Sequence, residues 1–98
     1  FRKWPTSQGG EVLALFPELP GTSNGRYCQS YQHTGQHGAA DLQTCIAATR
    51  PATVEEAAPL IRELESAPFH YLLRIIARIP ADAYRTRRAA LNEITRTV

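Results

Sequence analysis

The sequence predicts a single α+β domain, in which a small antiparallel-dominated sheet carries helices on one face in the order β-β-β-α-α-β-α. Three observations support this prediction. Short apolar runs in the first third of the chain are bounded by proline and glycine, as strands are. Later segments repeat apolar residues at the spacing of helices. The 98 residues, 43% of them hydrophobic and 20% charged, suffice for one core and leave no room for a second domain.

Three strands are predicted in the first third of the chain, each next to turn-forming residues. They cover residues 1–4, 11–16 and 26–32. The second strand is apolar on both faces, because residues 12–16 include no polar side chain, so we expect it inside the sheet. Pro17 and Pro20 should end it.

Helices are predicted at three places further along the chain. They begin at Asp41, Thr53 and Asp82 and end near Thr49, Ala67 and Thr97. The second start is the clearest, because Thr53 and Glu56 have the spacing of a capping box. Pro59 lies inside this helix and removes one backbone donor.

Residues 69–79 fit two templates. One set of apolar residues has helical spacing, and an overlapping set alternates as in a strand. The helical set is Leu72, Ile75, Ile76 and Ile79, and the alternating set is Tyr71, Leu73, Ile75, Ala77 and Ile79. The isoleucines, the flanking prolines and the need for a fourth strand favour a strand over a helix.

The stretch from Arg26 to Cys45 holds both cysteines and two of the three histidines. The side chains that could form a tetrahedral zinc site are Cys28, His33, His37 and Cys45. A zinc-stabilised domain is therefore one alternative. The spacing C-x4-H-x3-H-x7-C lacks the tight pairs of zinc frameworks, and Cys28 and His33 leave a strand on opposite faces. We therefore expect two separate thiols and no metal or cofactor.

The same stretch holds the residue types of a catalytic triad, so a small hydrolase is a second alternative. The nucleophile would be Cys28 or Ser30, and the other members of the triad would be Asp41 and either His33 or His37. However, Ser30 and His33 face opposite ways on the predicted strand, and no nucleophile elbow is present. We expect a protein that is not an enzyme, in which the histidines and Gln36 hold the strand-to-helix junction by hydrogen bonds to loop backbone.

Two surfaces are candidates for binding a partner. Residues 70–98 hold six arginines against two acidic residues, which makes this end of the chain basic. A protein or a nucleic acid would contact either the arginine face of the last helix or the third strand with the turn at Gly35–Gly38. The candidate residues are Arg85, Arg87, Arg88, Tyr27, Tyr31, His33, Gln36 and His37.

Three runs of the sequence resemble those of a known group of proteins. They are ALFPELPG, YCQSYQHTGQHGAAD and TRPATVEEAAPLIRELES. They resemble small uncharacterised proteins of bacterial phages and mobile elements, over about residues 10–68. The resemblance implies that genomic setting, in which small proteins often inhibit or regulate others by binding. The last 30 residues, with the arginine-rich helix, lie outside it.

The sequence as a whole predicts a cytoplasmic, non-enzymatic binding or regulatory module. No membrane partner is expected, because no apolar run approaches the roughly 20 residues of a membrane span. The identity of the partner and the oligomeric state stay open.

Overall fold

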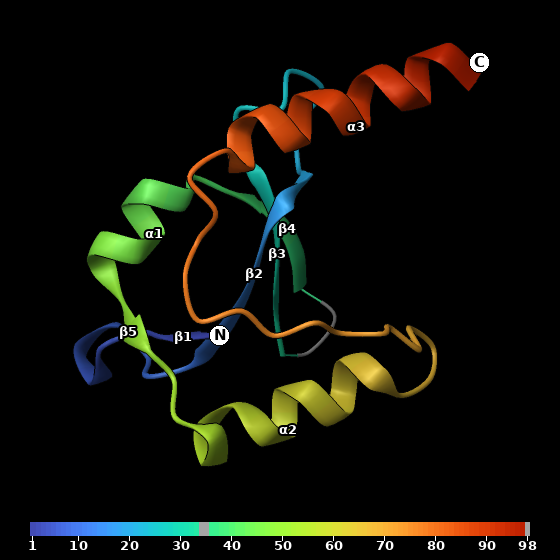
Figure 1. Cartoon of the computed structure of the whole chain (residues 1–98). Coiled ribbons are helices and arrows are strands. Elements are labelled where there is room, and N and C mark those ends of the chain that lie inside the picture. The colour runs from blue at the N-terminus through green and yellow to red at the C-terminus, as the bar shows by residue number, and fades with distance from the viewer. Residues whose placement is uncertain (34–35, 98) are drawn as a thin grey trace.

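The computed structural model describes residues 1–33 and 36–97, with the side chains of the last helix described as far as Glu93 (Figure 1). Within these ranges, five strands form one antiparallel sheet in the order β4-β3-β2-β1-β5, accompanied by three α-helices. The predicted α+β class and antiparallel sheet are therefore confirmed. The elements are β1 (Arg2–Lys3), the 3-10 helix η1 (Thr6–Gln8), β2 (Val12–Pro20), β3 (Cys28–Gln32), β4 (Gln36–Ala40), α1 (Leu42–Ala48), β5 (Arg50–Pro51), α2 (Val54–Glu65) and α3 (Ala83–Thr97).

β2 occupies the middle of the sheet, as its apolar residues predict. It pairs with β3 along one side and with β1 along the other, but β1 covers only Val12 and Leu13. The strand passes through Pro17 and ends at Pro20, so the expectation that Pro17 ends it is wrong. Its register with β3 shifts between Phe16 and Pro20, and such an irregularity accommodates proline within a strand.

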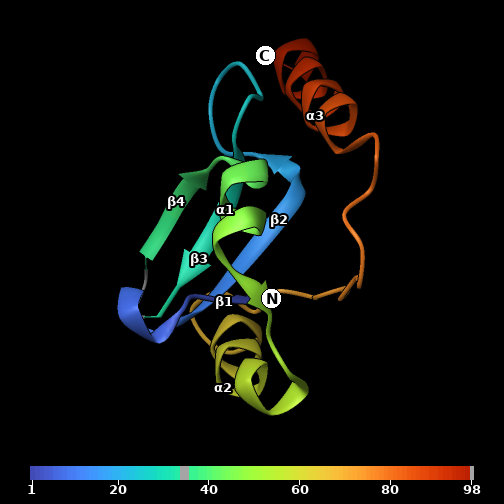
Figure 2. The same ribbon diagram turned by 90° about the vertical axis from the view of Figure 1, so that its left-hand side faces the viewer.

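The sheet buries residues on both faces. One core lies between the sheet and α2, and a second lies between the other face, α1 and the start of α3 (Figure 2). The buried residues are Ala14, Tyr31, Leu60 and Leu64 in the first core and Cys28, Ala40, Leu42 and Ala83 in the second. The expectation that all helices share one face is therefore wrong. The physical reason lies in β2, where Leu13 and Ala14 point to opposite faces and are both buried. Each face of the sheet therefore has to be covered by other elements.

The sequence does not predict β4 and β5. β4 pairs with β3 in regular antiparallel register, from Gln32 opposite Gln36 to Cys28 opposite Ala40. The turn expected at Gly35–Gly38 is thus a strand from Gln36 onward, and residues 34–35 lie outside the described residues. Glycine and alanine do not favour strands, so pairing with β3 rather than local propensity decides the structure of β4.

The three predicted helices are all present. Oγ1 of Thr53 accepts a hydrogen bond from the backbone N–H of Glu56 at 3.2 Å, and the Glu56 carboxylate accepts one from the N–H of Thr53 at 2.9 Å. The predicted capping box is thus confirmed, and Pro59 lies inside α2 as expected. No helix in the described ranges is long and apolar enough to cross a membrane.

Residues 69–79 form neither the predicted strand nor a helix. Figure 1 shows an irregular chain that leaves the end of α2, passes β2 and rises to α3. Phe69 and Leu73 pack on the core under α2, whereas Ile79 packs on the core under α1. The segment therefore moves from one face of the sheet to the other, and a straight strand on one side of the sheet could not contact both cores.

Candidate functional site

Cys28 and Cys45 lie on the α1 face of the sheet as free thiols, as predicted. Cys28 is fully buried and Cys45 is half-buried. Burial raises the pKa of both thiols, and for Cys28 it outweighs the opposing effect of the Arg87 guanidinium. Both thiols therefore stay protonated near neutral pH, and a protonated thiol is a poor nucleophile and metal ligand.

His33 and His37 lie on the opposite face. Nδ1 of His33 is 2.5 Å from Oε2 of Glu63 on α2, and the ring centroid of His37 is 4.7 Å from that of Tyr31. The sheet separates both histidines from both cysteines, so these four side chains cannot bind one zinc ion. Across the described ranges, no three histidine, cysteine, aspartate or glutamate side chains are placed to hold a metal ion.

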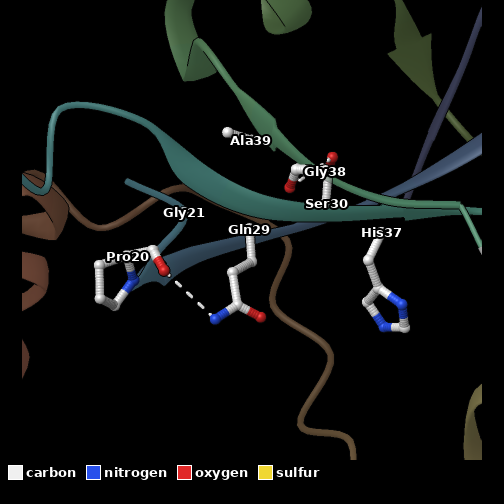
Figure 3. Close-up of a pocket in the computed structure, with 7 residues that line it drawn as sticks. All are labelled: Pro20, Gly21, Gln29, Ser30, His37, Gly38 and Ala39. Atoms are coloured by element: carbon white, nitrogen blue, oxygen red, sulfur yellow. Dashed lines mark hydrogen bonds between the residues drawn. The ribbon is translucent and has the colours of Figure 1, made fainter. Parts of the chain in front are cut away.

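The side chains of the hydrolase alternative are also kept apart. Oγ of Ser30 donates a hydrogen bond to the carbonyl oxygen of Gly38 at 3.2 Å, and Asp41 accepts one from Thr44 at 3.0 Å. Figure 3 shows Ser30 and His37 on opposite sides of the sheet. The candidate nucleophiles and the histidines therefore do not form the arrangement that a triad needs.

The predicted aromatic surface on β3 is mostly internal. Tyr31 is fully buried, and its hydroxyl donates a hydrogen bond to Oε1 of Glu63. Tyr27 is half-buried, with the Arg26 guanidinium 5.6 Å from its ring centroid. The Glu63 carboxylate on α2, rather than loop backbone, therefore anchors this part of β3. The exposed members of the predicted set are His33, Gln36 and His37.

Arg87 on α3 is buried, with 4% of its surface exposed, although we expected it to face outward. Its guanidinium donates hydrogen bonds of 2.6, 2.8 and 3.4 Å to the backbone carbonyls of Pro17, Gly25 and Arg26. Arg85 and Arg88 are exposed, and Arg88 donates to the carbonyl of Asn24 at 2.9 Å. Two of the three arginines predicted to bind a partner thus attach α3 to the loop between β2 and β3.

A groove of about 840 Å³ that the sequence does not predict lies between β2, α2 and residues 71–79. Its walls are largely apolar and include Phe16 of β2 and Ile61 of α2. On the irregular segment, Leu72 is fully exposed and Ile75 is 62% exposed. Contiguous apolar surface of this kind marks binding sites. One signal is present in the sequence, because only arginines interrupt the apolar run over residues 71–79.

Of the described residues, three arginines and one glutamate line this groove. Arg2 is held within the wall, where Nε donates to Oγ1 of Thr49 at 3.0 Å. Arg74 lies 3.4 Å from Oε1 of Glu18, and Arg78 is exposed. The mouth of the groove is therefore positively charged.

A smaller hollow of about 300 Å³ lies beside β3 and β4 (Figure 3). Nε2 of Gln29 donates to the carbonyl oxygen of Pro20 at 3.2 Å along its wall. Among the residues that the structure describes, the lining contains no aspartate, glutamate, lysine or arginine, and consists of Pro20, Gly21, Gln29, Ser30, His37, Gly38 and Ala39.

Comparisons of the chain with protein-family models, with curated proteins and with solved structures give no significant match.

Proposed function

We propose that the protein is a small non-enzymatic binding module, which docks a segment of a partner protein in the groove between β2 and residues 71–79. The observation that carries this proposal is the fully exposed Leu72 beside an apolar groove. Burying an exposed aliphatic side chain such as Leu72 or Ile75 against a partner contributes about 1.5–3 kcal/mol. Burial of apolar surface is the main driving force of most protein–protein association.

The charge at the mouth of the groove favours a partner segment that carries acidic residues. Glu18 already accompanies Arg74, so an aspartate or glutamate of the partner would pair best with Arg78. Such complementarity selects among partners and speeds association more than it raises affinity. The preferred occupant is therefore an apolar segment with at least one neighbouring carboxylate.

The arginine-rich end of the chain supports a nucleic-acid partner less well than the groove supports a protein partner. Phosphate binding needs guanidinium groups that can reach the backbone of the nucleic acid. Arg87 is buried, and Arg88 already donates to a loop carbonyl. Regulation by binding another protein also agrees with the setting that the resemblance to phage and mobile-element proteins implies.

The proposal can be tested by selecting random short peptides on the immobilised protein and measuring their affinity by fluorescence polarisation. We expect the selected peptides to combine aliphatic or aromatic residues with aspartate or glutamate. Leu72→Asp and Ile75→Asp should each weaken binding roughly tenfold or more, which is about 1.4 kcal/mol. The melting temperature should change little, because both side chains are exposed.

Ala89→Asp is the matched control, because Ala89 is exposed on α3 and does not line the groove. This variant should bind the peptides as the unchanged protein does. Peptides that bind the Leu72 and Ile75 variants with full affinity would place the site elsewhere. Tight binding of an oligonucleotide that falls steeply with added salt would instead support a nucleic-acid partner.

A further inference from the structure

The edges of the sheet differ in how they are protected from pairing with another strand. β5 forms one edge, is two residues long and consists of Arg50 and Pro51. Short length, charge and proline are three features that discourage edge-to-edge pairing. The part of β2 that extends past β1 contains Pro17, Glu18 and Pro20, and faces residues 71–79 across the groove.

β4 forms the other edge and lacks these features. It has five residues, and none of them is charged or proline. Its register with β3 runs without a shift from Gln36 to Ala40, so no bulge twists it away. All of its residues except Ala40 are exposed. In the described part of the chain, no backbone hydrogen bond outside the β3 pairing involves β4.

An edge strand in an antiparallel sheet directs the N–H and C=O groups of alternate residues away from the sheet. These groups lose no free energy while water reaches them, but they offer a template for a further strand. The edge strand β5 and the unpaired end of β2 are therefore protected, whereas the edge strand β4 is open and uncharged and offers a place for strand addition.

We propose that β4 is a self-association edge, at which two copies of the chain pair their β4 strands antiparallel about a two-fold axis and form one continuous sheet. Centring the pairing on Gly38 uses all five residues and sets His37 opposite Ala39 and Gln36 opposite Ala40 of the second copy. No two like charges meet in this register, and like charges directly opposite one another would destabilise it. The two-fold pairing closes the exposed edge of both copies, because each edge is complementary to itself.

The geometry next to β4 leaves room for a second copy. Gly38 has no side chain to obstruct the approach of two backbones at the axis, and Ala39 is small. Both residues also line the hollow of about 300 Å³ shown in Figure 3, whose described lining contains no aspartate, glutamate, lysine or arginine. Side chains of the second copy can therefore enter this hollow without leaving a buried charge unpaired.

Sedimentation velocity on the full chain tests the proposal. Pairing of two five-residue strands gives a small interface. Interfaces below roughly 1,200 Å² are weak, so we expect a dissociation constant for the dimer on the order of 10–100 µM. The mass should rise from that of one 10.9 kDa chain towards that of two as the concentration increases. Ala39→Lys should raise the dissociation constant about tenfold or more, because it places a charge at the pairing edge. Ala89→Lys adds the same charge on exposed α3 and should dimerise as the unchanged protein does.

A monomer over the whole range of concentration would overturn the proposal, as would unimpaired dimerisation of the Ala39→Lys variant. Circular dichroism establishes whether that variant is folded. If it is not, hydrogen exchange of the unchanged protein decides: amides of β4 should exchange more slowly at high concentration, while the amide of Arg50 on β5 should not change. Equal behaviour of both edges would contradict pairing at β4.

Discussion

Arg87 attaches α3 to the first half of the chain, because its buried guanidinium donates hydrogen bonds to the carbonyl oxygens of Pro17 and Gly25. In the sequence it is one of four arginines on a basic helix, and such residues are typical of a solvated face. In the structure its guanidinium reaches the carbonyl of Gly25, which is 62 positions away along the chain. No local pattern contains that information, because the partners are backbone groups and not side chains of complementary type.

Replacing Arg87 by alanine should therefore destabilise the fold. The carbonyls of Pro17 and Gly25 would lose charge-assisted hydrogen bonds in a buried site, and such bonds contribute about 1.5–3 kcal/mol each. We expect a loss of about 2–4 kcal/mol in the free energy of unfolding, measured by urea denaturation. Arg85→Ala, at an exposed position of the same helix, should stay within about 0.5 kcal/mol of the unchanged protein. Equal effects of the two substitutions would contradict a structural role for Arg87.

At the level of elements, the sequence predicts best where the determining interactions are local. The start of α2 is predicted correctly because Thr53 and Glu56 lie three residues apart and bond to each other's backbone. β4 is missed because its pairing with β3 overrides the low strand propensity of Gly38 and its neighbours. Residues 69–79 are missed because their path depends on two cores that lie on opposite faces.

The cap of α2 also predicts how stability depends on pH. The pKa of Glu56 is lowered from 4.5 to about 2, first by its hydrogen bonds to the Arg50 guanidinium and then by the backbone N–H of Thr53. A carboxylate with a lowered pKa stabilises the fold above its unfolded pKa, and that contribution is lost as pH falls towards the folded value. Glu56→Gln should therefore lower the melting temperature at pH 7, and its difference from the unchanged protein should shrink as pH falls from 4.5 to about 2.

Glu55→Gln is the control for this pH series, because Glu55 lies in the same first turn and is exposed. Its melting temperature should follow that of the unchanged protein through the acid range. A difference for Glu56→Gln that stays constant from pH 7 to pH 2 would show that the ion pair with Arg50 does not stabilise the start of α2.

For the whole molecule, the sheet decides which side chains can act together, because it separates the groups on its two faces. The alternation of Cys28, Ser30 and His33 along a strand predicts correctly that thiol and hydroxyl groups are kept from the histidines. The groove is not predictable in this way, because it forms between β2, α2 and a segment without regular structure. Such a surface depends on tertiary contacts, whereas the face on which a strand residue lies follows from whether its residue number is odd or even.

The attachment of the last helix to the first half of the chain gives a test at this scale. Gly25, in the loop between β2 and β3, has φ of 71°, and a Cβ there would lie 3.2 Å from side-chain carbons of Arg88 and Leu91 on α3. Gly9 also has a positive φ, 102°, but a Cβ there would meet nothing within 4 Å. Alanine at either position has the backbone cost of about 1–2 kcal/mol for a left-handed conformation. Gly25→Ala should cost more than Gly9→Ala in urea unfolding, because the Arg88 and Leu91 side chains must also shift by a few tenths of an ångström, and equal costs would mean that these side chains yield freely at this contact.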